Sequence, residues 1–337
     1  MIGSAFGKVG VLIGTAAGEG HAADSVSALS AWLKDSEVAF CEGRFDGDGP
    51  QGWVHLKPKD GSGDHRPYVE DLRSSVAAFA AWGVELIVCV GGDGLASYSA
   101  DAMISSGRRM TLFGVPAGTI NAGPIVTEGI EAVEPPSLSQ LRVEQVGAVE
   151  VLVDGEHVAY GFNDVVFGDT YLGTVGGKVG NLSARALLER GEKVEAKASK
   201  DIVSKRFRIF KNSRRLRPRN LRPAQLVAAP LRRREFFARA IAGVLCNASF
   251  MEGPAALSLF DSVIVSAGPP CHGLEDFSSS EQVLFGPGDL IEIEGLAEAG
   301  LIIADGNPYT RMGGVVSLRS IPNLVDVLRV DPRLPGG

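Results

Sequence analysis

Three short apolar runs alternate with segments of helical spacing in the first 115 residues, and this alternation limits the fold more than any other feature. The runs cover residues 8–14, 84–90 and 110–115. Helices are predicted at about 22–33, 69–82 and 96–106. Strand–helix alternation predicts a parallel α/β sheet, in which ligands bind at the carboxyl ends of the strands. Residues 36–66 are rich in glycine, aspartate and proline and are predicted to be a loop.

The pattern changes near residue 140. From there the apolar runs are short, closely spaced and separated by turn residues, among them "SVIVSAG" at 262–268. This spacing predicts a mostly antiparallel β second domain, with a hairpin turn at Asp154-Gly155. The "EPPS" stretch at 134–137 is a plausible hinge. We therefore divide the chain into an α/β domain at 1–138, a β-rich domain at 139–320, and a C-terminal segment at 321–337. For that last segment, a return to the first domain is one option.

Composition narrows the class of protein. The apolar and charged fractions are 45% and 22%, as in a globular protein, and no stretch predicts a membrane span or a secretory signal. The four cysteines have no metal-ligand spacing, so we expect reduced thiols in a cytoplasmic protein. The net charge is −7, yet residues 205–234 hold twelve Lys and Arg and no acid. Such a segment is either a solvated surface or a binding site for an anion.

A glycine-rich turn follows the second apolar run. Residues 91–94 are Gly-Gly-Asp-Gly, and a predicted helix begins close behind them. Gly91, Gly92 and Gly94 leave room for a phosphate at the backbone N–H groups, and a helix N-terminus adds free donors. Asp93 then has two interpretations. It orients or deprotonates a hydroxyl beside the phosphate, which makes it the candidate catalytic residue, or it is an ordinary N-cap.

A second polar loop, "FGVPAGTINAGPI" at 113–125, follows the next predicted strand. Neighbouring parallel strands end at the same edge of a sheet, so this loop is expected beside the first. Gly118, Thr119 and Asn121 offer close backbone approach, a hydroxyl and an amide, and are predicted to bind nucleotide or phosphate. The alternative is an ordinary turn.

Two further polar elements lie in the β-rich part. Asn163 and Asp164 interrupt the apolar stretch "YGFNDVVFGD" at 160–169, within what we interpret as a strand. A buried polar pair must be hydrogen-bonded or functional, because burying it unpaired costs free energy. Asp305 follows another apolar run and precedes a glycine. All three are candidate site residues, and the alternative for each site is a satisfied turn or bulge.

Together these elements resemble the NAD kinase and diacylglycerol kinase superfamily. The residues that carry the resemblance are "GGDG" at 91–94, "PAGTINAG" at 116–123, "FNDVVF" at 162–167 and "GPGDLIEIEG…LIIADG" at 286–306. Their order and approximate spacing agree over residues 84–320, and the chain looks most like the ATP-NAD kinase-like proteins grouped with AcoX.

The resemblance implies that the α/β domain at 1–138 binds the nucleotide, that the β-rich domain at 139–320 binds the acceptor, and that the nucleotide cleft lies between them. It implies Mg²⁺ and ATP as phosphoryl donor, with Asp93 as base or orienting group and Asn163 and Asp164 holding the acceptor. We assign Asp305 to acceptor binding as well. NAD is one possible acceptor, through its adenosine 2′-hydroxyl. No residue is assigned to metal binding. The partners implied are a nucleotide and a small molecule, without specific nucleic acid or a transmembrane segment, and a homo-oligomer is expected.

The chain also departs from the pattern. Leu95 stands where threonine usually follows the GGDG, and the Gly-Thr/Ser-Ala-Tyr stretch of NAD kinases is missing. These departures motivate an alternative, a nucleotide-binding sensor with little or no catalysis. The "NAGPI" ending of the second loop counts against a third hypothesis, a lipid kinase. A dehydrogenase is disfavoured because "GTAAGEGH" at 14–21 lacks the dinucleotide-binding spacing.

Overall fold

The computed structural model describes the chain in twelve stretches. They are residues 5–14, 27–41, 50–56, 68–117, 123–126, 137–175, 178–197, 199, 201–231, 253–268, 278–309 and 314–330. The chain divides into two compact units, Met1–Val146 with Asn323–Gly337, and Gly147–Pro322. In the described parts of the chain, no helix is long and apolar enough to cross a membrane.

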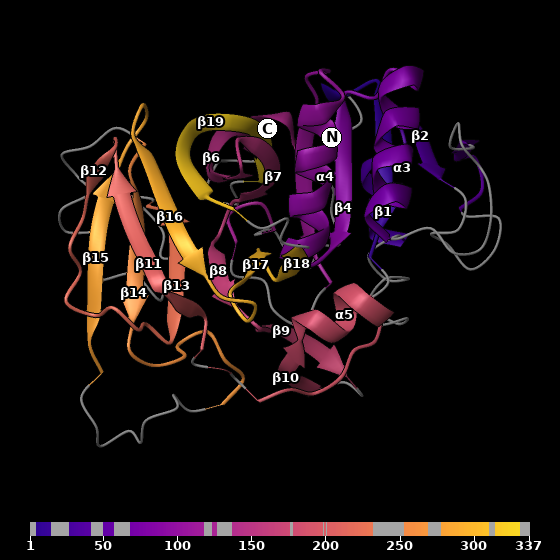
Figure 1. The fold of residues 1–337 in the computed structure, drawn as a ribbon. Helices are drawn as coiled ribbons and strands as arrows, with labels where there is room; N and C mark the ends of the chain where they lie inside the picture. The colour runs from indigo at the N-terminus through magenta and orange to yellow at the C-terminus, as the bar shows by residue number, and fades with distance from the viewer. Residues whose placement is uncertain are drawn as a thin grey trace. The chain divides into compact units, whose positions relative to one another are not determined.

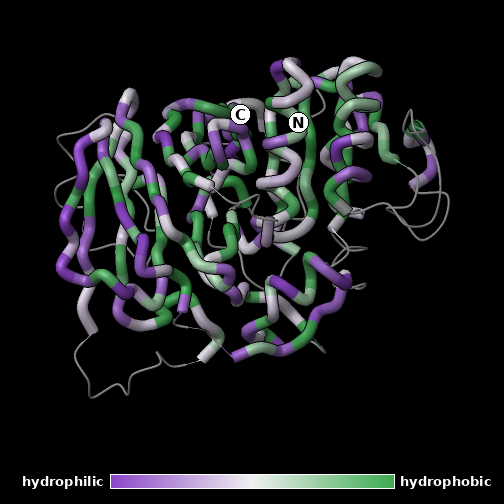
Figure 2. The backbone as a smooth tube through the Cα atoms, in the orientation of Figure 1, coloured by the Kyte–Doolittle hydropathy of each residue, from purple (hydrophilic) through white to green (hydrophobic). Residues whose placement is uncertain are grey.

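The first unit contains a parallel sheet in the order β3-β2-β1-β4-β5. Its strands are β1 (Lys8–Ile13), β2 (Glu37–Cys41), β3 (Val54–Leu56), β4 (Leu86–Gly91) and β5 (Thr111–Pro116). Helices α3 (Tyr68–Trp82) and α4 (Asp93–Ser105) lie side by side against this sheet (Figure 1). Every residue of β4 is buried, and the strand is almost uniformly hydrophobic in Figure 2.

The predicted strands and helices of this unit are present within a few residues, except in one region. Of the helix predicted at about 22–33, the structure describes helix at 27–32, and residues 22–26 lie outside the described residues. Residues 36–66 were expected to be loop, but they contribute β2 and β3. Strand β2 forms because Val38, Ala39, Phe40 and Cys41 are all buried alongside β1. The prediction missed this short apolar run because the residues around it are rich in glycine and aspartate.

The second unit has a six-stranded antiparallel sheet in the order β15-β14-β13-β8-β17-β18. These strands are β8 (Val165–Gly168), β13 (Gln225–Pro230), β14 (Ala255–Phe260), β15 (Ser280–Phe285), β17 (Leu301–Ala304) and β18 (Asn307–Tyr309). The antiparallel strands β12 (Arg214–Arg215), β11 (Val203–Lys211), β16 (Leu290–Leu296) and the first part of β19 (Val316–Val330) form a second layer. Residues such as Phe167, Leu257 and Ile293 from the two layers share one core.

Smaller elements complete the described chain. They are the 3-10 turn Leu138–Gln140, β6 (Leu141–Val153), β7 (Glu156–Gly161), β9 (Thr170–Val175), β10 (Lys178–Ser183) and α5 (Ala184–Arg190). The β6–β7 hairpin turns at Asp154-Gly155, with φ of 51° and 86°, which confirms the predicted turn. The "EPPS" hinge lies almost wholly outside the described residues.

One predicted strand of the second unit is wrong. Residues 262–268 were expected to form a strand and instead form bends. The backbone N–H groups of Ile264 and Val265 both donate to Oε1 of Gln225, at 2.9 Å each. A buried side-chain amide therefore takes the place of a neighbouring strand.

The predicted fold class is confirmed: a parallel α/β unit and a mostly antiparallel β unit. The sequence suggested a boundary at residue 138, whereas the first unit extends to Val146 and resumes at Asn323. Strand β19 passes from the second unit into the first, where Asp326 and Val327 pair in parallel with β5. The two buried cysteines of the described chain, Cys41 and Cys89, are free thiols. Burial raises the pKa of Cys89 to about 12, so its thiol stays protonated at neutral pH.

Candidate active site

Asp93 is the first residue of helix α4, not its N-cap. Gly92 occupies the N-cap position in extended conformation, and no side chain caps the helix there. The carboxylate of Asp93 instead accepts a hydrogen bond from the backbone N–H of Gly123, at 2.8 Å. This bond joins the two loops that follow β4 and β5, as expected for neighbouring parallel strands. The N-cap interpretation of Asp93 is therefore wrong.

Gly123 is a residue that the sequence analysis did not single out. A Cβ atom at this position would lie 2.8 Å from Oδ1 and 2.9 Å from Cγ of Asp93, which is too close for any side chain. The absence of a side chain at Gly123 therefore permits the contact. The "PAGTINAG" motif contains this glycine, but only the three-dimensional approach of Asp93 shows why it is needed.

A buried arginine fixes the residue after Gly123. The side chain of Arg329, on β19, is 4% exposed and pairs with Glu144 at 3.0 Å. Its Nη2 donates to the carbonyl of Pro124. Charged side chains are seldom buried without such partners. Arg329 therefore connects strand β19 to the loop that contacts Asp93. No sequence motif predicted this role.

Leu95 occupies the position at which a hydroxyl was expected from the family resemblance. Its side chain is 5% exposed. It lies so close to Gly91 that a Cβ there would come within 2.8 Å of Cδ2 of Leu95. The end of β4 is therefore covered by an apolar side chain, and position 95 offers nothing polar to a phosphate.

The other predicted phosphate-binding residues divide into two groups. Gly91, Gly92 and Gly94 lie at the end of β4 and the start of α4, where the first N–H groups of a helix lack intrahelical partners. Gly118, Thr119 and Asn121 lie outside the described residues.

Asn163 and Asp164 lie in a turn between β7 and β8, not within a strand as expected. The turn is held by Asp305, whose carboxylate accepts from the backbone N–H groups of Phe162, Asn163 and Asp164 at 2.8, 2.8 and 3.0 Å. The backbone N–H of Asp305 in turn donates to the carbonyl of Asp164, at 3.0 Å. The predicted polar trio is thus brought together within the second unit.

The three side chains of this trio have different surroundings. Asp305 is 7% exposed and has a φ of 48° in the turn between β17 and β18. Asn163 donates from Nδ2 to Oδ2 of Asp164 at 3.2 Å. The Oδ1 atom of Asn163 is buried and has no hydrogen-bond partner among the described residues. Buried acceptors are normally satisfied, so this atom is available to a donor such as a hydroxyl.

No group of three or more His, Cys, Asp or Glu in the described chain is arranged to hold a metal ion. Mg²⁺ does not require such a group when it is bound with a nucleotide. It commonly uses one or two carboxylates together with phosphate oxygens and water. Asp93, next to the helix N-terminus, has the chemistry for that role.

Two comparisons of the sequence with known proteins each match part of the chain. Residues 8–153 match the family model of the diacylglycerol kinase catalytic domain. An uncharacterized protein of Archaeoglobus fulgidus is 40% identical over 114 residues, which are 34% of this chain and 33% of that protein. The chain thus matches about a third of that relative's length.

Solved structures match over nearly the whole chain. A diacylglycerol kinase from Bacillus anthracis aligns with a TM-score of 0.53 and 15% identity, over 98% of this chain and 99% of that one. Yeast NADH kinase, in complex with NADH, aligns with a TM-score of 0.51 and 11% identity, over 98% and 84%. Identities this low show a common fold. The resemblance to the NAD kinase and diacylglycerol kinase superfamily is confirmed, and the finer likeness to the AcoX group stays a prediction.

Proposed function

We propose that this protein is an ATP-dependent kinase, which transfers the γ-phosphoryl group of ATP to a hydroxyl of a small molecule or nucleotide. NAD is one candidate acceptor. The observation that carries the proposal is the position of Asp93, whose carboxylate lies at the start of α4 and contacts Gly123 instead of capping the helix. The match of residues 8–153 to a kinase catalytic domain supports it.

The donor phosphates are proposed to bind at the N-terminus of α4. Gly91, Gly92 and Gly94 allow close approach to the backbone, and the helix N-terminus favours negative charge. Gly118, Thr119 and Asn121 are proposed to bind phosphate or ribose from the following loop. Mg²⁺, bound with the phosphates, would neutralise the charge that develops on the transferred group.

Asp93 is proposed to orient the acceptor hydroxyl and to take its proton as the oxygen attacks phosphorus. The N–H of Gly123 keeps the carboxylate in one orientation. A positioned base of this kind contributes roughly 10²–10⁴-fold to a rate. The role requires an ionised carboxylate and does not tolerate an amide.

The acceptor is proposed to bind at Asn163 and Asp164. The buried Oδ1 of Asn163 can accept a hydrogen bond from an acceptor hydroxyl. Asp305, assigned to the same function from the sequence, is proposed to contribute by fixing this turn, because its carboxylate already accepts three backbone N–H groups.

The test is a transfer assay with Mg²⁺ and γ-labelled ATP against NAD, nucleosides, sugars, short polyols and diacylglycerol. Mass spectrometry identifies the labelled product. Asp93→Asn is expected to lower turnover by roughly 10²–10⁴-fold while ATP still binds. Gly123→Ala is expected to lower turnover as well, because its Cβ would displace the carboxylate. Glu70→Gln, an exposed carboxylate on α3, serves as control. Unchanged turnover in Asp93→Asn would remove the proposed role.

One observation favours a second function. Leu95 covers the end of β4 and supplies no hydroxyl to a phosphate. This is what we would expect of a protein that still binds the nucleotide but has lost efficient phosphoryl transfer. Such a sensor predicts saturable binding of ATP or NAD without any labelled product. Stoichiometric phosphorylation of any acceptor in the pool excludes it.

A further inference from the structure

A groove lies at the end of helix α4 that is distant from Asp93, within the first unit. Its volume is about 340 Å³, at the lower end of the range of about 300–1,000 Å³ for small-molecule sites. It is lined by the last turn of α4, the turn that leads to β5, Gln145 of β6 and residues 323–326 of β19. Ile104 on its wall lies about 16 Å beyond Asp93 along the helix axis. This α4 groove is therefore separate from the proposed site of phosphoryl transfer.

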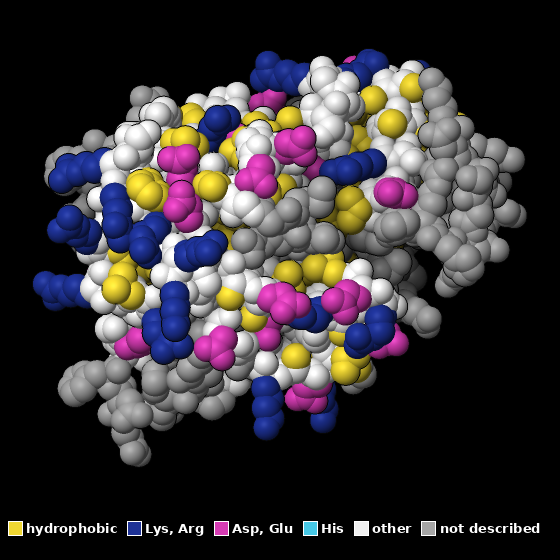
Figure 3. Space-filling view, viewed as in Figure 1, with side chains coloured by type: hydrophobic (Ala, Val, Ile, Leu, Met, Phe, Trp, Pro, Cys, Tyr) yellow, Lys and Arg dark blue, Asp and Glu magenta, His cyan; other side chains and the backbone are white. Residues whose placement is uncertain are grey.

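The floor of the α4 groove is apolar. Met103, Met110 and Val325 are 4%, 2% and 3% exposed, and Ile104 and Leu324 are half-buried beside them. Methionine side chains adapt their shape to an apolar ligand and make favourable contacts with aromatic rings. In Figure 3, Lys and Arg side chains project at the upper end of α4, with acidic and hydrophobic side chains close beside them. The groove therefore offers a ligand both hydrocarbon and charge.

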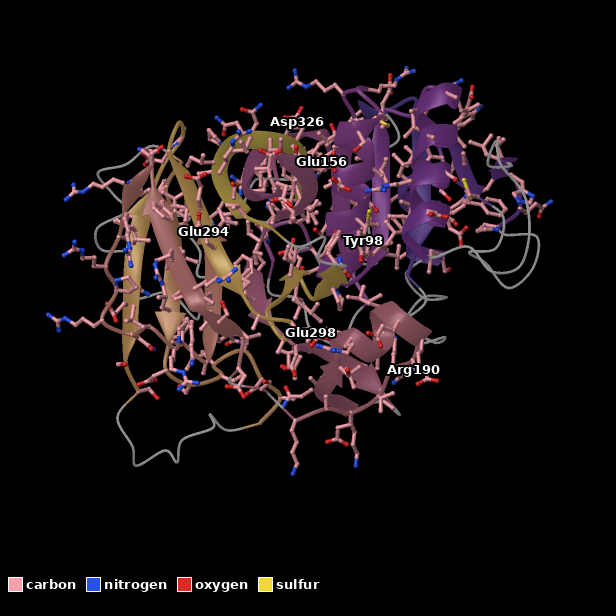
Figure 4. The ribbon with its side chains drawn as sticks, in the orientation of Figure 1. Tyr98, Glu156, Arg190, Glu294, Glu298 and Asp326 are labelled. Atoms are coloured by element: carbon pink, nitrogen blue, oxygen red, sulfur yellow. The ribbon has the colours of Figure 1, made fainter. Side chains whose placement is uncertain are left out.

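The rim of the groove carries a guanidinium that an ion pair holds in place. Nε and Nη2 of Arg109 both lie 2.8 Å from Oδ2 of Asp326, which Figure 4 labels near the upper end of α4. Nε2 of Gln145 donates to Oδ1 of the same carboxylate, at 3.3 Å. The Arg109 side chain is nonetheless 81% exposed, and among the described residues nothing else bonds to its guanidinium. The edge formed by Nη1 and Nη2 is thus available to a second carboxylate, in the two-pronged geometry that arginine favours.

The turn between α4 and β5 is also held in place. Gly107 has a φ of 66°, and its N–H donates to the carbonyl of Ile104 at 3.0 Å, which ends the helix. Nη1 of Arg108 donates to the carbonyl of Ala80, at the end of α3, at 2.6 Å. A ligand in the groove would therefore order few protein groups on binding, which lowers the entropic cost.

The charges around the groove favour a ligand with a single negative charge. The charged lining residues are Arg108, Arg109 and Asp326, two positive and one negative, which leaves a net charge of +1. The carbonyl end of α4 adds partial negative charge to the same wall. A phosphate dianion would exceed the positive charge at hand, whereas a carboxylate matches it. A cation gains little, because the carboxylate of Asp326 is already paired.

We propose that the α4 groove binds a small monocarboxylate with an apolar body. The carboxylate accepts hydrogen bonds from Nη1 and Nη2 of Arg109, and the body packs against Met103, Met110 and Leu324. This binding does not involve Asp93 and is independent of the proposed phosphoryl transfer, so each proposal can fail without the other.

The test is isothermal titration calorimetry of the full chain with hydrocinnamate, which joins a carboxylate to a phenyl ring through a short chain. Hydrocinnamide and hydrocinnamyl alcohol have the same body without the charge, and phenethyl phosphate carries a dianion. Saturable binding of hydrocinnamate is expected, roughly 10-fold or more tighter than that of the amide or the alcohol, because hydrogen bonds between charged groups are the stronger ones. Phenethyl phosphate should bind more weakly than hydrocinnamate.

Variants of the groove separate its two parts. Arg109→Gln should weaken hydrocinnamate binding by roughly 10-fold or more, because it removes the guanidinium and leaves the charge of Asp326 unpaired. Arg109→Lys keeps the charge without the paired donors and should give a smaller loss. Leu324→Ser should weaken hydrocinnamate, its amide and its alcohol alike, because all three share the apolar body.

Matched controls lie in the second unit. Arg190→Gln breaks an exposed ion pair of the same kind, in which Nε of Arg190 lies 2.9 Å from Glu192, and Val194→Ser removes an apolar side chain that is 42% exposed. Both should bind hydrocinnamate as the unmodified protein does. Absence of hydrocinnamate binding overturns the proposal, as does equal binding of the neutral amide or an equal loss in Arg190→Gln. Tighter binding of phenethyl phosphate, abolished by Arg109→Gln, would overturn the monocarboxylate and assign the groove to a phosphate ester.

Discussion

The two polar sites of this molecule are built in opposite ways. Asp93 stands where a buried strand gives way to a helix, so its place is set by the residues directly around it, with one hydrogen bond to Gly123 added from the next loop. The turn that holds Asn163 and Asp164 owes its shape to Asp305, which lies more than 140 residues further along the chain. One site is local, and the other depends on distant pairing.

This difference predicts how each site responds to damage. Loss of the Asp93 carboxylate should impair the reaction and leave the fold intact, because β4 is held by burial and α4 has no side-chain cap to lose. Loss of the Asp305 carboxylate should first weaken the fold, because buried N–H groups lose their acceptor. Substitutions that remove a charge without changing size test that contrast.

Asp305→Asn should produce the largest loss of stability. Three backbone N–H groups share the carboxylate of Asp305, and an amide brings one acceptor oxygen and an NH₂ group in its place. We expect a loss of about 3 kcal/mol in the free energy of unfolding, measured by urea titration. Acceptor binding should weaken with it.

Asp154→Asn is the matched control for this change. Both aspartates precede glycine in a turn, with φ of 48° at Asp305 and 51° at Asp154. Asparagine tolerates this conformation, so neither variant strains the backbone. Asp154 accepts one N–H, from Val315 at 2.9 Å, and its variant should lose less than about 1 kcal/mol. Equal losses at the two positions would show that the three N–H hydrogen bonds to Asp305 stabilise the fold no more than the single bond to Asp154.

Arg329→Met tests the support of the loop that contacts Asp93. The substitution retains an apolar stem but removes the ion pair to Glu144 and the bond to Pro124. Breaking a buried pair costs about 3–5 kcal/mol, and Glu144 is 30% exposed and can hydrate, so we expect about 2 kcal/mol. Thermal unfolding measures the loss.

Arg319→Met, on the same strand, provides the control for that prediction. Arg319 is 51% exposed and pairs loosely with Glu150, at 3.8 Å. Its variant should lose less than about 1 kcal/mol. If phosphoryl transfer falls in Arg329→Met and not in Arg319→Met, the loop around Gly123 needs this support. Equal stability of the two variants would mean that Arg329 does not brace the loop.

The sequence predicted the strand, turn and helix around Asp93 well. The strand, the glycine turn and the helix around Asp93 follow from an apolar run, from glycine and from helical spacing, which all act over a few residues. The sequence left two interpretations of Asp93 open, and only the fold decides against the N-cap, because it shows that Gly123 approaches the carboxylate. Buried β2 was missed for a related reason: its burial depends on β1, not on its own flanks.

The distant site could be predicted only in part. Polar residues in apolar surroundings marked Asn163, Asp164 and Asp305 as requiring partners, and the structure supplies them to one another. Nothing in the spacing showed that they would meet, since strand pairing brings β8 and β17 together. Arg329 left no trace in the sequence, because an arginine in a strand is normally exposed.

A third long-range contact, between Arg109 and Asp326, gives the smallest expected effect and limits the general lesson. It too joins distant residues, at 2.8 Å, but Arg109 is 81% exposed. Asp326 is labelled in Figure 4. Its pKa is held below the ordinary value by hydrogen bonds and charge from Arg109 and by Gln145, against the effect of burial. A contact between residues distant in sequence should therefore add little stability when one partner, here Arg109, is exposed to solvent.

The sign of the pH dependence follows from that direction. A lowered pKa in the folded state stabilises the fold above the ordinary aspartate value of about 3.9, and the contribution disappears as pH falls through the folded pKa. Arg109→Gln should therefore cause a small loss of stability at neutral pH and none in strong acid. Urea unfolding of both proteins across this range gives the difference, in which other titrating groups such as Asp289 cancel. A difference that does not change with pH would mean that Arg109 acts through packing, and the contrast between buried and solvated long-range contacts would fail at this position.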